Sequence, residues 1–191
     1  MRRKDREMSE AFGLSVIDEA PFGTLSINDS DSEVPYAVPL SIVRSDDLLF
    51  FHAARSGKKH ELFRNHTPVR IVFVGHAKVP DLFSEKALAS EVRDGRADTL
   101  LSKVFTTEYR SAIVVGTIRL LDREREPALF KEALRLISEK YTPDKMAYFE
   151  AAFASGAKKT DVFEVKIESI TAKRKQFSST GEELKWQKAM E

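Results

Sequence analysis

Residues 55–59, Arg-Ser-Gly-Lys-Lys, combine the residue types that bind an anionic group. They follow the apolar run 48–54, which predicts a strand with both faces covered, and they precede a short helix expected at residues 60–65. Glycine allows close backbone approach, the lysines supply charge, and free N–H groups at a helix start favour an anion. The sequence therefore predicts a phosphate-type site, with a solvated turn as the ordinary alternative. The glycine spacing does not fit a nucleotide P-loop.

His52 lies at the end of this predicted strand, on the same face as Leu48 and Phe50. Its ordinary role on such a strand is that of a hydrogen-bonded structural residue, and a place beside the ligand is the alternative. The other three histidines show no metal-ligand spacing, and the chain has no cysteine. Because there is also no Gly-x-Ser-x-Gly elbow and no arguable carboxylate pair, we predict neither a metal site nor a hydrolytic centre.

The strand before this site contains two prolines. Residues 34–43 read as a strand, and residues 44–47 turn the chain directly into the strand that ends at His52, so antiparallel pairing is expected. Proline cannot donate a hydrogen bond to a sheet, which assigns Pro39 to an edge, a bulge or a break. Backbone groups beside such a position are free to bind a ligand.

The remaining pattern predicts a mainly β protein with flanking helices. Further strands are expected at 22–27, 68–74, 109–121 and 163–167, and helices at 127–141 and 143–156. We divide this single domain, 1–191, into a barrel core (8–75 and 106–170), a helical insertion (76–105) and a polar tail (171–191). Residues 106–111 are either a turn that starts a strand or a second half of the anion site. Trp186 in the tail is interpreted as a docking anchor rather than a lid over a ligand ring.

The composition is that of an ordinary globular protein. The 191 residues include 31 basic and 30 acidic side chains, for a net charge of +1, which argues against a surface built for nucleic acid. No apolar run approaches the roughly 20 residues of a membrane span, and the charged N-terminus lacks a signal-peptide pattern. We expect a cytoplasmic protein without nucleic-acid or membrane partners.

Three motifs together resemble a known family. They are Pro-Tyr-Ala-Val-Pro-Leu at residues 35–40, Phe-His-x-Ala-x-x-Gly-x-Lys at residues 51–59, and Thr-x-Tyr-Arg-Ser at residues 107–111 followed by Gly116. Their order and spacing over residues 8–170 are similar to those of the FMN-binding split-barrel proteins. This group includes pyridoxamine 5′-phosphate oxidase, and the sequence is most similar to its 5-nitroimidazole-resistance (Nim-type) branch. The insertion at residues 76–105, and Lys58 in place of an expected histidine, depart from the pattern.

The resemblance implies a six-stranded antiparallel split β-barrel that forms a homodimer with FMN at the interface. Lys59, supported by Arg55 or Lys58, would neutralise the FMN phosphate. Val38 and Pro39 would place backbone beside the flavin ring, and His52 would lie near that ring. The complete set of cofactor-binding residues implied in this way is Ala37, Val38, Pro39, His52, Ala54, Arg55, Gly57, Lys58, Lys59, Tyr109, Arg110 and Ser111.

The expected function is that of an FMN-dependent oxidoreductase that passes electrons from a nicotinamide cofactor to a small-molecule substrate such as a nitro compound. The first alternative is a flavin- or haem-binding module without efficient turnover. Pyridoxamine 5′-phosphate oxidase activity ranks lower, because residues specific for pyridoxal phosphate are not recognisable. A dimeric scaffold without a cofactor is the third alternative.

Overall fold

The computed structural model describes residues 3–63 and 66–185. Its strands all belong to one antiparallel sheet, in the order β3-β2-β6-β7-β8-β5-β4, with β1 paired to β8. The strands are Glu7–Met8 (β1), Gly23–Ile27 (β2), Tyr36–Leu40 (β3), Val43–Ser45 (β4), Leu48–Ala54 (β5), Thr67–Lys78 (β6), Glu108–Leu120 (β7) and Thr160–Lys175 (β8).

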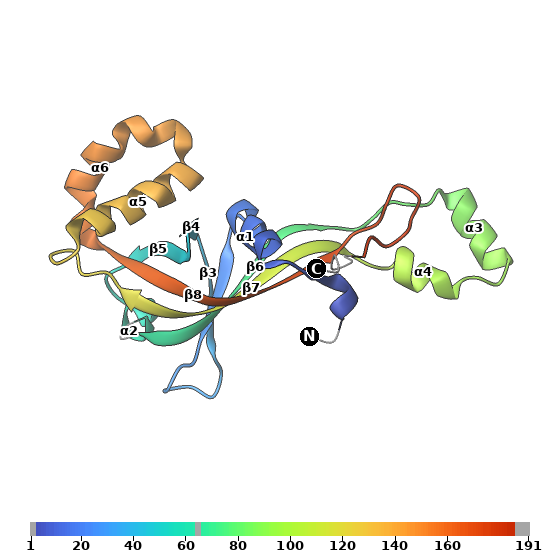
Figure 1. Cartoon of the computed structure of the whole chain (residues 1–191), viewed down its shortest axis with the longest axis horizontal. Coiled ribbons are helices and arrows are strands. Elements are labelled where there is room, and N and C mark those ends of the chain that lie inside the picture. The colour runs from blue at the N-terminus through green and yellow to red at the C-terminus, as the bar shows by residue number, and fades with distance from the viewer. Residues whose placement is uncertain (1–2, 64–65, 186–191) are drawn as a thin grey trace, which may run out of the picture.

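Most helices lie toward the two ends of the long strands, whereas the first α-helix along the chain packs against their middle (Figure 1). The helices are Glu10–Glu19 (α1), Lys58–Leu62 (α2), Glu85–Arg93 (α3), Asp98–Lys103 (α4), Pro127–Tyr141 (α5) and Phe149–Gly156 (α6), with 3₁₀ turns at Lys4–Arg6, Pro143–Tyr148 and Ala157–Lys159. α5 and α6 lie at one end of the long strands, and α3 and α4 lie at the other end. No helix in the described parts of the chain is long and apolar enough to cross a membrane.

The sheet curls around a core that both faces of β5 help to form. Leu49, Phe51 and Ala53 are buried inside the curl, in the cluster that also contains Phe163 of β8. Phe50 points the other way and is buried under α5. The expectation that this strand is covered on both faces is therefore confirmed. Apolar residues on both sides are the reason, because each face has a layer to pack against.

The curl does not close into a continuous barrel. β3 and β4 stand at the two ends of the strand order, although only residues 41 and 42 separate them in the chain. Pro39 thus lies in an edge strand, as predicted. The split-barrel class is confirmed, but the sheet has eight strands instead of six. The increase arises because the break at residues 41–42 divides one expected strand and because β1 is a two-residue addition.

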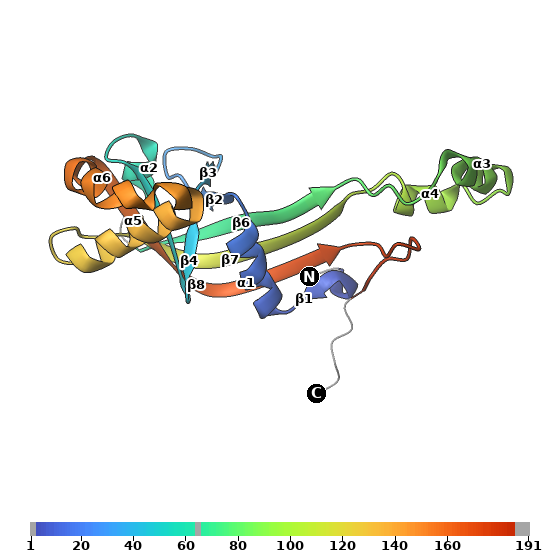
Figure 2. The same cartoon turned by 90° about the horizontal axis from the view of Figure 1, so that it is seen from above.

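Three strands extend well beyond the barrel and form an arm (Figure 2). β6 runs to Lys78, β7 begins at Glu108 and β8 continues to Lys175, whereas the sequence suggested a strand only at residues 163–167. The longer β8 follows from its pairing with β7 along nearly its whole length. α3 and α4 form the tip, so the segment expected as a helical insertion stands away from the barrel.

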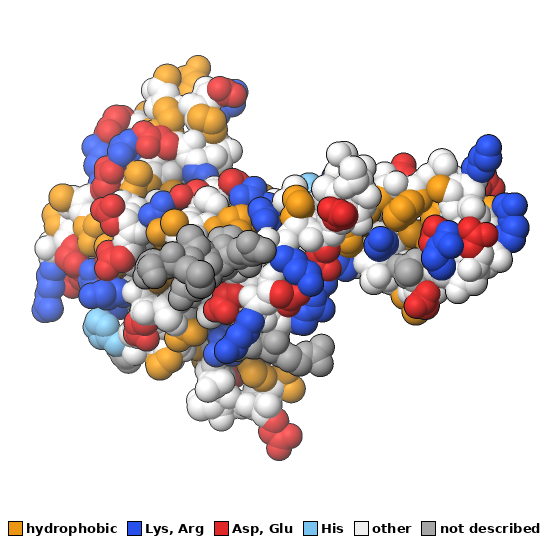
Figure 3. All heavy atoms as spheres, turned by 45° about the vertical axis from the view of Figure 1, so that its right-hand side comes forward, with side chains coloured by type: hydrophobic (Ala, Val, Ile, Leu, Met, Phe, Trp, Pro, Cys, Tyr) orange, Lys and Arg blue, Asp and Glu red, His pale blue; other side chains and the backbone are white. Residues whose placement is uncertain are grey.

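The arm exposes several apolar side chains. Val79, Leu101 and Phe105 are exposed, and Phe105 keeps 74% of its surface accessible. Acidic and basic side chains are interspersed over the face shown in Figure 3, in line with the near-zero net charge. Trp186, which we interpreted as an anchor, lies outside the described residues.

Candidate functional site

Gly57, in the middle of the cationic segment 55–59, has a backbone conformation that favours glycine. Its φ of +87° lies in a region that side chains with a Cβ rarely adopt. The chain then enters α2, which contains Lys58 and Lys59 but is only five residues long. A helix this short has a weak dipole, so the lysine charges contribute more to an anion site here than the helix start does.

Phe63, immediately after α2, fixes this segment to the barrel. Its ring is fully buried and meets Phe51 of β5 edge-on, with centroids 5.7 Å apart, and Phe163 of β8 in the same way at 5.5 Å. On another side it lies 6.2 Å from the ring of Tyr36 in β3. One buried ring therefore connects β5, the start of β3 and the short helix α2 with Lys58 and Lys59. We call residues 55–59 the lysine segment and this meeting point the junction.

Two unpaired strand edges meet at this junction. β3 is bonded to β2 on one side only, since it ends the strand order. β4 covers only Leu48–Phe50 of β5, so the following residues, 51–54, are bonded to β8 but not on their other side. Backbone N–H and C=O groups along both edges are available to a ligand that replaces a neighbouring strand.

Ala37, Pro39, His52 and Ala54 present their side chains away from the barrel core. All four are exposed, and they alternate with inward residues of their strands, such as Val38 in β3. The structure thus brings the predicted ring-side residues of β3 and β5 to the same junction.

Lys59 and His52 influence each other electrostatically. Loss of hydration, and then the Lys59 charge, lower the pKa of His52 below its ordinary value of 6.5. His52 is therefore neutral at pH 7. Lys59 is half-buried and forms no hydrogen bond or ion pair with the residues that the structure describes. Among the described residues of this segment, the Lys59 charge is therefore not balanced by a carboxylate, in contrast to those of Lys58 and Arg55.

Lys58 has a different environment. Its ammonium lies 2.7 Å from a carboxylate oxygen of Asp29, in the loop between β2 and β3. This pair raises the pKa of Lys58 and lowers that of Asp29. Asp29 was not among the predicted site residues, because which turn faces Lys58 depends on the strand order and not on a local pattern. Lys58 ties the loop to α2, and its charge is already balanced.

Arg55 points to the opposite side of the segment. Its Nε lies 3.4 Å from Asp161 at the start of β8, and its Nη1 donates to the Lys158 carbonyl at 3.1 Å. His60 also contacts Asp161 through Nδ1. Arg55 and His60 line an open pocket of about 870 Å³ together with the segment after β7, whose arginines and carboxylates both face it, so the pocket carries charges of both signs.

The structure does not bring Tyr109, Arg110 and Ser111 to this junction. They belong to the first part of β7, which pairs with residues 173–175 of β8, whereas Ala54 pairs with Thr160. At about 3.3 Å per residue, the two ends of β8 are roughly 50 Å apart along the strand. Arg110 also points to the opposite face from its two neighbours and bonds Glu19 of α1.

Comparison with known proteins agrees with this geometry. Residues 13–174 match the family model described as pyridoxamine 5′-phosphate oxidase. Among proteins of curated function, a search finds no match.

Solved structures share the fold at low sequence identity. A candidate 5-nitroimidazole antibiotic resistance protein from Bacteroides thetaiotaomicron is 23% identical, with a TM-score of 0.60 and coverage of 88% of this chain and 86% of that one. An FAD- and haem-binding protein from Mycobacterium smegmatis is 15% identical, with a TM-score of 0.65 and coverage of 90% and 73%. A flavocytochrome from Azotobacter vinelandii is also 15% identical, with a TM-score of 0.63 and coverage of 92% and 70%.

The family match spans most of the chain and includes both strand edges, the lysine segment and the long strands behind them. The chain belongs to the pyridoxamine 5′-phosphate oxidase family of flavin-binding split barrels.

Proposed function

We propose that this protein is an FMN-dependent oxidoreductase that passes electrons from a nicotinamide cofactor to a small acceptor such as a nitro compound. The observation that carries the proposal is the junction of two unpaired strand edges with the free charge of Lys59. A flat ring system with polar edges can bond to exposed strand backbone, while a phosphate group requires a cation nearby. Family membership supports a flavin as the ligand that combines these features.

The residues present at the junction fit a flavin mononucleotide. Lys59 would bind the phosphate, and Gly57 would let the backbone approach it. The Ala37–Pro39 edge would face the ring, with Pro39 offering only its carbonyl as an acceptor. His52, held neutral, would lie beside the ring without adding charge. A bound flavin supplies the redox chemistry, and the protein supplies position, charge and exclusion of water.

A homodimer is part of the proposal, because one sheet face is apolar and uncovered. Val72 and Val74 of β6 are exposed on the outer face, next to Ile113 and Val115 of β7. We call these four residues the outer patch. Ser111 is the cross-strand partner of Val74 and shares this face. Association of two copies over the outer patch would bring Tyr109 and Ser111 of one copy toward the junction of the other.

Absorbance of the purified protein tests the proposal. We expect flavin bands near 375 and 450 nm, release of FMN on denaturation, bleaching by a reduced nicotinamide cofactor, and recovery when a nitroimidazole is added. A colourless protein whose melting temperature does not respond to FMN would contradict flavin binding. A yellow protein that is not bleached would contradict the oxidoreductase role alone.

A flavin- or haem-binding module without turnover is the second candidate. Two of the structures that share the fold are described as an FAD- and haem-binding protein and a flavocytochrome. This candidate predicts a Soret band near 400 nm after addition of haem, or FAD instead of FMN among the released cofactors. Mass spectrometry of the released cofactor distinguishes the two flavins.

A further inference from the structure

A row of basic side chains crosses three neighbouring strands where the arm leaves the barrel. Arg110 of β7 has His76 of β6 as its cross-strand partner on one side and Arg174 of β8 on the other. Cross-strand partners place their side chains on the same face of a sheet. Ala112, two residues further along β7 on the same face, is fully buried, so the core of the barrel begins next to these basic side chains. We call His76, Arg110 and Arg174 the cation row.

The two arginines of the cation row have unequal partners. Arg110 donates to Glu19 of α1 at 2.8 Å, and its guanidinium lies 4.8 Å from the centre of the Phe12 ring. Arg174 forms no side-chain hydrogen bond or ion pair with the described residues, and its Nε is buried without an acceptor. Like charges directly opposite one another destabilise a sheet, and buried donors without acceptors are rare. The row therefore lacks an anion at Arg174.

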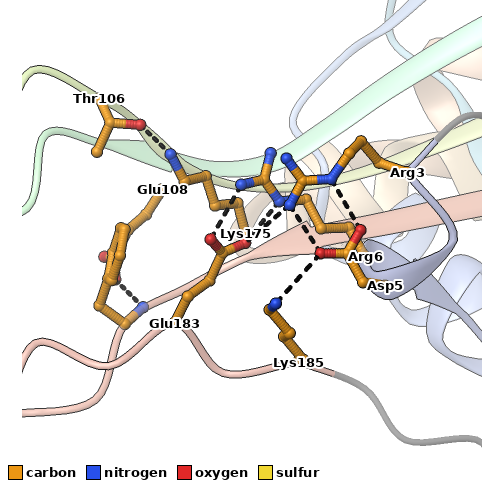
Figure 4. A network of polar contacts seen from close by, with 9 residues as sticks. Arg3, Asp5, Arg6, Thr106, Glu108, Lys175, Glu183 and Lys185 are labelled. Carbon is orange, nitrogen blue, oxygen red and sulfur yellow. Dashed lines mark hydrogen bonds and ion pairs between the residues drawn. The ribbon is translucent and has the colours of Figure 1, made fainter. Parts of the chain in front are cut away.

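Two carboxylates of this region, Glu108 and Glu183, already have other partners. Glu108 is buried, accepts a hydrogen bond from the Phe177 backbone N–H at 2.7 Å, and lies 3.2 Å from the Lys78 ammonium. Glu183 is bonded by Arg6 at 2.6 Å, as Figure 4 shows. Each of these acids neutralises a cation outside the row, so neither compensates Arg174.

Lys175, the next residue of β8, is another buried cation at this end of the strand, and its side chain starts on the opposite sheet face from Arg174. It is 8% exposed, bonds the Thr106 hydroxyl, and forms no ion pair within the described residues (Figure 4). Burial, and then the charge of Arg6, lower the pKa of this lysine. Lys175 and the cation row line a cavity of about 310 Å³, in which Glu108 is the one carboxylate.

We propose that this cavity binds a small oxyanion, the phosphate or carboxylate group of a small molecule, through Arg174, with Arg110 beside it on the same sheet face. An oxyanion between Arg174 and Arg110 would replace their repulsion by charge-assisted hydrogen bonds, for which the guanidinium fork is well suited. The volume lies at the small end of ligand pockets. Within one chain the site is at the opposite end of β8 from the proposed flavin site, and Arg110 and Arg174 lie on the opposite sheet face from Tyr109 and Ser111. It is therefore a second site, and the proposal does not rest on flavin binding.

Titration of the full-length protein with inorganic phosphate at constant ionic strength tests this site. Calorimetry should detect one phosphate per chain, and phosphate should raise the melting temperature by mass action. Arg174→Gln, which keeps the length but removes the charge, should weaken binding by about 10- to 100-fold. A parallel titration with acetate shows whether the site also takes a carboxylate group.

Arg93→Ala, on an exposed part of α3, is the matched control and should bind phosphate like the wild type. Equal phosphate affinity in Arg174→Gln and wild type would overturn the proposal, as would a melting temperature that responds equally to phosphate and chloride. The flavin absorbance of the same samples should not change in Arg174→Gln. A loss of flavin would instead make the row part of the flavin site. If phosphate dissociated a dimer, the row would be an interface between copies.

Discussion

The two ends of β8 both carry surplus positive charge, but they are constructed differently. At Thr160 the cations belong to a loop and a five-residue helix beside open strand edges, and a buried phenylalanine holds them in place. At Lys175 the cations are side chains of paired strands, facing a cavity of about 310 Å³. A loop with free backbone beside it suits a large ligand with a flat ring, whereas a fixed row of side chains suits a compact anion. The same sign of charge thus predicts two different ligands.

The largest expected difference between the two ends is the effect of removing an aromatic ring on the free energy of unfolding. Phe63→Ala removes a fully buried ring that contacts β3, β5 and β8, and we expect a loss of about 3–5 kcal/mol in the free energy of unfolding. Phe105→Ala, in the exposed arm, should change that free energy by less than about 0.5 kcal/mol. Urea unfolding at a fixed protein concentration measures both. A large loss for Phe105→Ala would show that the arm is covered in solution.

The proposed dimer depends on the outer patch rather than on the apolar residues of the arm. Val74→Asp would bury an unpaired charge in the interface and should weaken dimerisation by at least about 100-fold. Val92→Asp, at an exposed position of α3, is the control and should leave the dimer intact. Sedimentation velocity distinguishes the two states. A dimer that persists in Val74→Asp but dissociates in Val92→Asp would assign the interface to the arm.

The lysine segment should respond to substitution through its charge. Lys59→Ala is expected to weaken FMN binding by about 1.5–3 kcal/mol, the range for hydrogen bonds to charged groups, or roughly 10- to 150-fold. Lys86→Ala, on the exposed face of α3, provides a lysine control at the other end of the molecule. Fluorescence titration of FMN measures both affinities. An unchanged affinity for Lys59→Ala would remove this lysine from the flavin site.

Short sequence patterns predicted the features that depend only on neighbouring residues, such as the burial of a strand or the place of a proline at a sheet edge. The apolar residues on both faces of residues 48–54 predicted that β5 is covered on both sides. Pro39 indicated the edge strand. At Gly116 a Cβ would meet the Lys166 carbonyl oxygen at 2.3 Å, so the close pairing of β7 with β8 at this register shift requires glycine.

The sequence did not predict which strands pair with one another, or in which register. Tyr109 to Ser111 were grouped with the lysine segment because residues 106–111 are polar and because of the family resemblance, yet within one chain the 16 residues of β8 separate the two regions. The ion pair of Lys58 with Asp29 and the opposition of Arg110 to Arg174 both depend on which strands lie side by side. No local pattern encodes that pairing, because it is decided by the packing of the whole sheet.

The smallest effect expected at the lysine end concerns the protonation of His52. Its folded pKa is below the ordinary value of 6.5, so the folded protein binds fewer protons than the unfolded chain as the pH falls through that value. Stability should therefore decrease from pH 7 toward the folded pKa, and His52→Asn should flatten that part of the pH profile.

Lys59→Ala removes one cause of this depression and should raise the pKa of His52, whereas Lys86→Ala should not. Titration of the His52 ring proton by NMR reports the shift directly. Because a phosphate bound at Lys59 would neutralise the same charge, adding FMN to the wild type should also raise the pKa of His52. A His52 pKa that ignored both the substitution and the cofactor would separate His52 from the Lys59 charge, and would leave loss of hydration as the sole cause of its low value.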